Sequence, residues 1–433
     1  MRRAFLLICY LAAAIATAAQ NYPYQDNVLW VTTPSNTQWL YQLNEEAKVT
    51  VSLYEYGIQK SDIEVSYSIG PELMPPERTG TAVLKNGQAV ISMGTMHQPG
   101  FKDCQLKVIL NGEVYTHHIK VGFQPDQLLP YTQLPSDFVA FWEKAKAEAA
   151  RCPIEVTKVP VPAYSSSKVD CYLVKLQAYQ KGQYVYGYLT LPKQPGKYPV
   201  VFSPPGAGIK PMNPTKDIFY AENGCIRFDM EIHGIRPDLD EATYQEISQA
   251  FGKGNNSYLV NGLENRNSYY MKKVYLSCIR AIDYLTSLPE WDGKNVIAQG
   301  GSQGGALALV ATALDKRITA CAASHPALSD MAGYKANRAD GYPHLLTSFQ
   351  GMDTPEKLKT LEYYDVVNFA KQITVPVFMT WGYNDNVCPP TTSYIVYNVL
   401  SCKKEALITP VTEHWISQTT RHHILDWIKG QLR

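Results

Sequence analysis

A serine flanked by glycines stands where an apolar run meets a helical pattern. The pentapeptide Gly300-Gly301-Ser302-Gln303-Gly304 follows the apolar residues 295–299 and precedes the helical pattern of 305–310. A strand that turns sharply into a helix strains the backbone of its middle residue, tolerates only small neighbours, and lifts the side chain clear of the sheet. Ser302 is therefore the first candidate for a nucleophile in acyl transfer. Because the short pattern also occurs as an ordinary helix start, the rest of the chain must support this role.

A carboxylate suited to the second role lies downstream. A serine hydroxyl needs a histidine base that is oriented by an acid, and in this kind of fold the three follow in the order Ser, acid, His. Asp385 lies in the loop 382–390, directly after the apolar run 375–380. The carboxyl end of a parallel strand is where ligands bind in open α/β sheets. We predict that Asp385 is the acid, although an aspartate there could also simply shape a turn.

His414 is the candidate base. It follows a short predicted strand at 406–409, and of the nine histidines it alone both follows a predicted strand and lies downstream of Ser302 and Asp385. This position completes the expected order of the three residues.

Other histidines fit the base role less well. His422 and His423 fall within residues 420–428, which have the apolar spacing of an amphipathic C-terminal helix. We expect them to be surface or packing residues. His325 follows the predicted strand 318–323 but precedes Asp385, so it breaks the expected order.

The oxyanion of a tetrahedral intermediate needs hydrogen-bond donors. One is expected from the backbone N–H of Gln303, directly after the nucleophile, and the other from the loop after an earlier strand. That loop follows residues 198–203 and contains prolines and glycines. We choose the N–H of Ala207, with Gly206 or Gly208 as alternatives; a Pro-Gly stretch is also ordinary turn sequence.

With these motifs the chain resembles the acetyl xylan esterase and cephalosporin-C deacetylase family of α/β-hydrolases. The likeness spreads over about residues 130–433, and the extended elbow is more specific than its five-residue core. The segments that carry it are 300–308, Asp385 with 388–392, Ser136-Asp137-Phe138 with Phe141-Trp142, and 275–281.

The resemblance implies Ser302 as nucleophile, Asp385 as orienting acid and His414 as general base. It implies hydrolysis of acetyl esters on sugars, with no metal and no other cofactor. Members of this family often assemble into rings, so a homo-oligomer is possible, although an extra N-terminal domain could block or change that assembly.

Three positions depart from the family pattern. Residues 231–234 read Glu-Ile-His-Gly where Arg-Gly-Gln-Gly is usual, Trp415 stands where Glu often follows the catalytic His, and Ala207 replaces a common aromatic residue. All three are expected near the pocket, so the ester that is cleaved stays open.

The first residues indicate export. Met1-Arg2-Arg3 is a positive segment, residues 4–16 are largely apolar, and small residues precede Gln20, so residues 1–19 are predicted to be a cleavable signal peptide. The apolar run is too short for a membrane span. The mature protein is expected to be secreted or periplasmic.

Charge argues against nucleic-acid partners. Loss of two arginines with the leader would take the formal charge of the chain from +1 to −1, and nucleic-acid binding depends on a basic surface. We expect neither nucleic acid nor an anionic membrane as a partner. The 30 tyrosines and 7 tryptophans suit sugar stacking and ordinary packing equally well.

The cysteines show no metal or redox pattern. Eight remain after Cys9 is removed with the leader, and their irregular spacing includes no C-x-x-C and no zinc motif. We expect mostly buried thiols. Cys388 lies in the acid loop and is expected to be structural, since no histidine arrangement in the sequence makes it a nucleophile.

The chain is long enough for at least two domains, and its character changes near residue 125. We predict a small immunoglobulin-like β-sandwich at 20–123, a linker at 124–135 and an α/β-hydrolase domain with a doubly wound, mostly parallel sheet at 136–433. The sandwich prediction rests on short alternating runs and on hairpin turns at Asn86-Gly87 and Asn111-Gly112. We expect the sandwich to be a spacer or packing module more than a glycan-binding one.

In the predicted hydrolase domain, strands and helices alternate. It begins with a helix at 137–150, capped by Ser136, and a hairpin of 171–176 with 185–191. Residues 237–267 are polar without a clear period, and we expect them to form an insertion near the active-site mouth.

The leading hypothesis is a secreted serine esterase that removes acetyl groups from plant-type polysaccharides or oligosaccharides such as acetylated xylan. A peptidase of the prolyl-oligopeptidase type uses the same elbow and order, but commonly carries a β-propeller that about 100 N-terminal residues cannot supply. A non-catalytic glycan-binding protein on a hydrolase scaffold is a third alternative. Loss of one of the three residues would favour it, and none is missing.

Overall fold

The protein is described here by a computed structural model that covers residues 24–250 and 257–433. The predicted signal peptide, residues 1–19, lies outside the described residues. Within them, no helix is both long and apolar enough to cross a bilayer.

The described N-terminal residues form two five-stranded sheets. In one sheet the order is β1-β2-β4-β5 with β8 also paired to β4, and in the other it is β3-β10-β9-β6-β7. All neighbours are antiparallel except β3 and β10. The strands are Tyr24–Gln25 (β1), Val28–Pro34 (β2), Leu40–Tyr41 (β3), Ala47–Glu55 (β4), Ile58–Gln59 (β5), Glu64–Pro71 (β6), Arg78–Val83 (β7), Ala89–Gly94 (β8), Gly100–Leu110 (β9) and Glu113–Phe123 (β10).

Alternation explains how these two sheets pack. Ala47, Val49, Val51 and Leu53 of β4 are fully buried in the core between the two sheets. They are every second residue of the strand, because successive side chains of a strand point to opposite faces of its sheet. Asn111 and Gly112 both have positive φ and connect β9 to β10, which confirms that predicted hairpin turn. The immunoglobulin-like topology and the domain boundaries stay predictions.

A nine-stranded mixed sheet fills the rest of the chain. Its order is β11-β12-β13-β15-β14-β16-β17-β18-β19 in the described residues, antiparallel from β11 to β15 and parallel from β15 to β19. The strands are Val156–Pro160 (β11), Val169–Gln177 (β12), Tyr184–Pro192 (β13), Tyr198–Ser203 (β14), Ile226–Met230 (β15), Trp291–Gly301 (β16), Ala320–Ser324 (β17), Val377–Trp381 (β18) and Lys404–Ile408 (β19).

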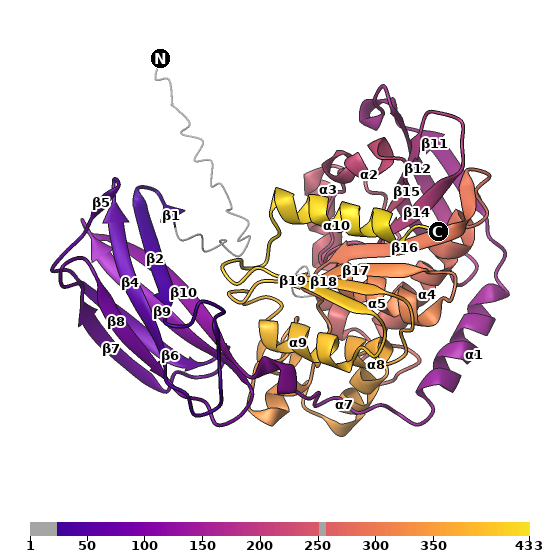
Figure 1. The fold of residues 1–433 in the computed structure, drawn as a ribbon. Coiled ribbons are helices and arrows are strands. Elements are labelled where there is room, and N and C mark those ends of the chain that lie inside the picture. The colour runs from indigo at the N-terminus through magenta and orange to yellow at the C-terminus, as the bar shows by residue number, and fades with distance from the viewer. Residues whose placement is uncertain (1–23, 251–256) are drawn as a thin grey trace, which may run out of the picture.

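Helices cover both faces of this sheet, as Figure 1 shows. Val296 and Ala298 of β16 point into the larger core, whereas Ile297 between them points into the smaller one. The larger core includes α1, α4, α5, α8 and α9, and the smaller one includes α2 and α10. The α-helices are Phe138–Ala150 (α1), Phe219–Glu222 (α2), Glu241–Ala250 (α3), Tyr270–Leu285 (α4), Gln303–Leu314 (α5), Leu345–Ser348 (α6), Pro355–Glu362 (α7), Val366–Ala370 (α8), Pro390–Val399 (α9) and Gln418–Gln431 (α10). The chain thus has an α/β fold.

One local prediction needs correction. Ser136 does not cap α1, because Asp137 precedes the helix there and no side chain caps it. The stretch 237–267, which is expected to be an insertion, contains α3, and before this helix the side chain of Asp240 accepts a hydrogen bond from the N–H of Thr243 at 2.9 Å. The predicted linker contains a short 3-10 helix at Pro125–Gln127.

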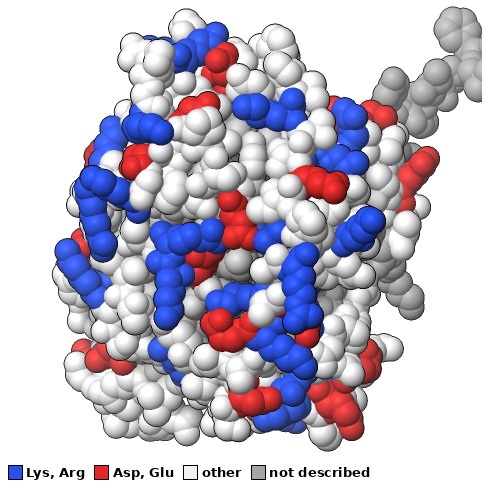
Figure 2. Space-filling model, turned by 90° about the vertical axis from the view of Figure 1, so that its right-hand side faces the viewer, with Lys and Arg blue, Asp and Glu red and all other residues white. Residues whose placement is uncertain are grey.

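The charged surface is mixed. On the face drawn in Figure 2, lysines and arginines lie among aspartates and glutamates. This distribution agrees with the small formal net charge of +1 for the whole chain.

The described cysteines are free thiols. Six of the eight are buried, and Cys152 and Cys402 are partly exposed. The prediction of mostly buried thiols is therefore confirmed.

Candidate active site

Ser302 lies at the tight turn between β16 and α5. Its backbone angles, φ of +59° and ψ of −128°, lie in a region that residues other than glycine rarely adopt. The glycines around it are required by space, because a Cβ on Gly300 would lie 2.4 Å from the carbonyl oxygen of Gly304. A Cβ on Gly304 would lie equally close to the carbonyl oxygen of Pro204. The strained turn that the sequence predicts at Ser302 is therefore present.

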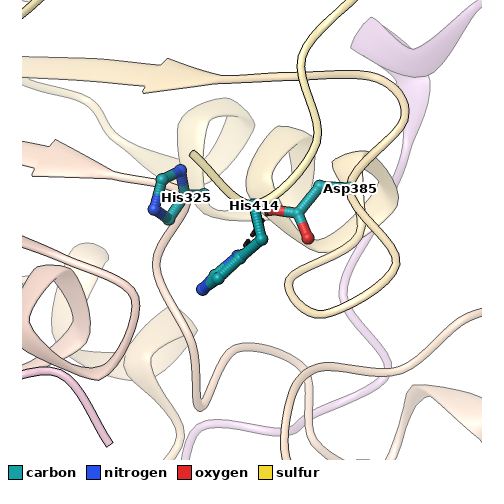
Figure 3. Close-up of side chains that lie close together, drawn as sticks. All are labelled: His325, Asp385 and His414. Carbon is teal, nitrogen blue, oxygen red and sulfur yellow. Dashed lines mark hydrogen bonds and ion pairs between the residues drawn. The ribbon is translucent and has the colours of Figure 1, made fainter. Parts of the chain in front are cut away.

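Asp385 is held in the loop between β18 and α9. The carboxylate is fully buried, and its Oδ1 accepts hydrogen bonds from the N–H groups of Val387 and Cys388, both at 2.8 Å. Its Oδ2 accepts from Nδ1 of His414 at 2.8 Å, the bond that Figure 3 marks with a dashed line. Since an ionised carboxylate only accepts, Nδ1 of His414 carries the proton and Nε2 is left as the acceptor.

Contact between the two residues changes the pKa of each. Burial alone would raise the pKa of Asp385, but the charge and hydrogen bond of His414 and the N–H of Cys388 hold that pKa below its ordinary value. Burial lowers the pKa of His414, whereas the neighbouring Cys388 sulfur and the Asp385 carboxylate raise it, and the net direction is upward.

The two loops that carry Asp385 and His414 are in close contact. A Cβ on Gly382 would lie 1.9 Å from the carbonyl oxygen of Thr412, so only glycine allows this approach. The N–H of Asn384 also donates to the Thr412 carbonyl at 3.2 Å. The geometry of the Asp385–His414 pair therefore depends on how these loops pack.

Ser302 and His414 open onto one pocket of about 830 Å³, whose wall also includes His325, Trp415 and Gly206. Among the described contacts, no hydrogen bond joins the Ser302 hydroxyl to His414. Such bonds are often absent before substrate binds.

Cys388 adjoins both Ser302 and His414. Its thiol interacts with both the His414 ring and the Ser302 hydroxyl, and burial raises its pKa. The sequence did not indicate that a histidine adjoins this cysteine. Because the raised pKa keeps it a thiol, Cys388 is a poorer nucleophile here than its position suggests.

The candidate oxyanion donors lie at the start of α5 and in the loop after β14. Gln303 is the first residue of α5, and N–H groups at a helix start have no partner within the helix. The N–H of Gly208 faces the hydroxyl of Tyr258 at 3.4 Å. Gly206 belongs to the pocket wall, so it stays a candidate for the second donor beside Ala207.

Tyr258 links a predicted insertion to the elbow. Its hydroxyl donates to Oε1 of Gln303 at 2.5 Å, and its ring lies 4.7 Å from that of His233 between centroids. Nδ1 of His233 is 2.8 Å from the Tyr270 hydroxyl. The stretch 237–267 therefore contacts the elbow, and His233, a departure from the family pattern, lies beside it.

His325 is a pocket residue that order along the chain did not reveal. It follows β17 with a φ of +30°, and its ring centroid lies 4.4 Å from that of His414, so the two rings are side by side in Figure 3. Burial, with a smaller contribution from His414, lowers its pKa to about 3. His325 follows the carboxyl end of β17, which lies in the sheet between the strand before Ser302 and the strand before Asp385. This position in the sequence of strands is the signal that could have identified it as a pocket residue.

The pocket also holds an ion-pair cluster on one wall. Arg227 donates to Asp229 at 3.0 Å and to Asp217 at 3.3 Å, and Arg421 donates to Asp217 at 2.7 Å. Oδ2 of Asp229 is buried without a partner among the described residues. Burial raises the pKa of Asp229 to about 6.

One group of residues has the spacing to ligate a metal. His325, Asp385 and His414 can each offer an atom, all within 4.8 Å of one another. Two of the three are already bonded as the Asp385–His414 pair, so their closeness needs no metal to explain it.

His422 and His423, the other histidines that the sequence analysis weighed as the base, are exposed on α10.

Comparisons with known proteins agree with one another. The family model for acetyl xylan esterase (AXE1) matches residues 126–431. The chain is 53% identical over 435 residues to the acetyl esterase Axe7A of Xylanibacter ruminicola, and this alignment covers 100% of the chain and 98% of that protein.

Two solved structures have the same fold. An acetyl xylan esterase from Paenibacillus sp. R4 has a TM-score of 0.62 at 27% identity, covering 71% of this chain and 99% of that one. Acetyl xylan esterase 1 from Thermoanaerobacterium sp. JW/SL YS485 also has a TM-score of 0.62, at 22% identity, covering 72% and 98%. At that identity, the second likeness concerns the fold alone.

Proposed function

The chain belongs to the acetyl xylan esterase family, and from that premise we propose that it is a secreted serine esterase that removes acetyl groups from plant-type polysaccharides or oligosaccharides such as acetylated xylan. The observation that carries the proposal is the hydrogen-bonded Asp385–His414 pair at the wall of the pocket onto which Ser302 opens. The comparisons favour an ester hydrolase over the peptidase and the non-catalytic binding protein.

The first half of the reaction acylates Ser302. Rotation about its Cα–Cβ bond brings the hydroxyl from Cys388 to Nε2 of His414, which takes the proton while Oγ attacks the acetyl carbonyl carbon. Asp385 keeps the proton on Nδ1 and stabilises the imidazolium that forms. The sugar hydroxyl then leaves with the proton from His414.

The second half releases acetate. Water gives its proton to His414 and attacks the acetyl–Ser302 carbonyl, and collapse of this intermediate returns the proton to Oγ. In both halves the N–H of Gln303 and that of Ala207 or Gly206 donate to the oxyanion.

The pocket wall suits a sugar. Phe219 and Trp415 line the pocket and offer aromatic surfaces on which a sugar ring can stack. Secretion rests on the charge and apolar pattern of residues 1–19, and N-terminal sequencing of the exported protein would test it.

Acetate release from a panel of acetylated glycans tests the proposal. We expect Ser302→Ala to lose activity by at least about 10³-fold, whereas Ser277→Ala, in buried helix α4 away from the pocket, stays near wild type. Cys388→Ala separates the two possible nucleophiles. Loss of activity in Cys388→Ala with retention in Ser302→Ala would overturn the assignment of the serine.

A further inference from the structure

The acid loop is hydrogen-bonded to a residue of the N-terminal sheets. Lys120 of β10 is fully buried, and its Nζ donates to the carbonyl oxygen of Asp385 at 2.8 Å. The backbone N–H of the same lysine donates to Oδ1 of Asn384 at 2.9 Å. One residue of β10 thus holds two consecutive residues of the loop that carries the acid.

Glu72 completes this contact. Its Oε1 accepts from Nζ of Lys120 at 2.6 Å, and its Oε2 faces the N–H of Thr391 in α9 at 3.4 Å. Both charged side chains are excluded from water. A buried ion pair of this kind adds little net stability, because the loss of hydration offsets the attraction between the charges. Removal or displacement of one partner leaves the other charge buried and uncompensated, which disfavours any other arrangement of Glu72 and Lys120.

The histidine loop is tied to the same strand. Nε2 of His118 lies 3.2 Å from a carboxylate oxygen of Glu413, the residue before His414, and its Nδ1 lies 3.1 Å from Oδ1 of Asp103 in β9. His118 and Lys120 are two residues apart, so both point to the same face of β10. That face meets both catalytic loops.

Apolar packing supports the polar contacts. The Phe101 ring of β9 lies 5.0 Å from that of Tyr383 and 5.7 Å from that of Tyr394, between centroids. These tyrosines flank the acid loop on either side. In Figure 1 the N-terminal strands lie beside the yellow loops that follow β18 and β19.

We propose that Lys120 and His118 are positioning residues, through which the N-terminal sheets hold Asp385 and His414 in the geometry that the reaction needs. The inference rests on the proposed function, because it assigns these contacts a role in that chemistry. Both residues precede the segment that matches the family model, and none of the described N-terminal residues lines the pocket. The N-terminal sheets therefore contact the loops that carry Asp385 and His414 on the side away from the pocket, and they are more than a spacer.

Variants of the buried pair test this role. Lys120→Met removes the bond to the Asp385 carbonyl, and Glu72→Gln/Lys120→Met removes it without leaving a charge unpaired. Lys102→Met is the matched control: Lys102 is a buried lysine of β9 whose bonds, to the Thr95 carbonyl at 2.8 Å and to Glu77 at 2.8 Å, stay within the N-terminal sheets.

Full-length variants are compared on 4-nitrophenyl acetate, with the folded fraction measured by circular dichroism. We expect kcat to fall about 10- to 100-fold in both Lys120 variants, since displacement of a catalytic group by about 1 Å has this effect, with KM within about twofold. Lys102→Met should keep the wild-type kcat.

The pH profile separates positioning from simple loss of stability. A loosened Asp385 raises the pKa of His414 less, so the acid limb of kcat/KM moves to lower pH in the Lys120 variants. Loss of folded protein alone would lower the curve without moving it. Should both variants match Lys102→Met in kcat and acid limb, the inference is wrong, whereas acetate release by Ser302→Ala overturns the proposed function independently.

Discussion

At the scale of single residues, the site depends on the direction of one hydrogen bond. Oδ1 of Asp385 is occupied by the N–H groups of Val387 and Cys388, so only Oδ2 is free to orient His414. This division of the two oxygens fixes which nitrogen of His414 carries the proton. A base with Nε2 unprotonated is what Ser302 requires.

Asp385→Asn should reverse that direction. The amide oxygen would stay with the two N–H donors, so the NH₂ group would face Nδ1 of His414 and drive the proton to Nε2, which can then no longer accept from Ser302. We expect kcat to fall about 10³- to 10⁴-fold with little change in thermal stability, measured on 4-nitrophenyl acetate and by thermal unfolding.

Asp315→Asn is the control for this change. Asp315 is also buried, but its partner is Arg317 and it lies outside the pocket. A kcat for Asp385→Asn within tenfold of that of Asp315→Asn would contradict an orienting role for Asp385.

At the scale of elements, the loops that carry Asp385 and His414 are packed between the nine-stranded sheet and β10. His118 is the titratable part of this contact, with Asp103 and Glu413 at its two nitrogens and with Lys120 and His117 nearby on β10. Burial lowers the pKa of His118, but the two carboxylates outweigh it and raise the pKa to about 9. The protonated ring thus joins β9 to the histidine loop.

This pKa predicts how the contribution of His118 to stability changes with pH. A folded-state pKa of about 9, above the ordinary 6.5, gives a contribution that is fully present below about pH 6.5 and is lost as pH rises through 9. Its upper limit is about 3 kcal/mol. We expect the difference in free energy of unfolding between wild type and His118→Gln, from urea titrations, to be large at pH 6 and small at pH 9.5.

The neighbouring histidine provides the comparison. His117 faces Thr32 and Trp30 inside the sandwich, and burial lowers its pKa to about 4. Because this pKa lies below the ordinary 6.5, replacement of His117 by glutamine should give a difference that stays constant above about pH 7.5 and changes only as the pH falls through 6.5. A constant difference for His118→Gln as well would show that His118 is not charged in the folded protein.

At the scale of the whole molecule, the two parts of the chain share a core. Phe101 belongs to an N-terminal strand, yet it is buried with residues of the hydrolase part and is 1% exposed. The two parts are therefore expected to stabilise each other, since neither can bury this ring alone.

Phe101→Ala tests that expectation. Removal of a buried phenylalanine typically costs about 3–5 kcal/mol, and we expect the urea midpoint of both parts of the chain to fall. Tryptophan fluorescence and limited proteolysis would follow the two parts together. Val90→Ala, at a position 65% exposed in β8, should change stability by less than about 0.5 kcal/mol; an equal response of the two variants would exclude a shared core.

The sequence alone determined what local interactions encode. Apolar periodicity and glycine spacing predicted the strands on either side of Ser302, the strained turn and the hairpin at Asn111-Gly112, because each depends on residues close together in the chain. The order of Ser302, Asp385 and His414 along these elements followed from the fold type, and the Asp385–His414 contact agrees with it.

Only the tertiary structure decided which distant groups surround that contact. His325 lies against His414, Cys388 interacts with both His414 and Ser302, and Lys120 bonds to the acid loop across 265 positions of sequence. No periodicity connects such residues, because their approach depends on how whole sheets and loops dock. The support that the N-terminal strands give to the site is a property of that docking.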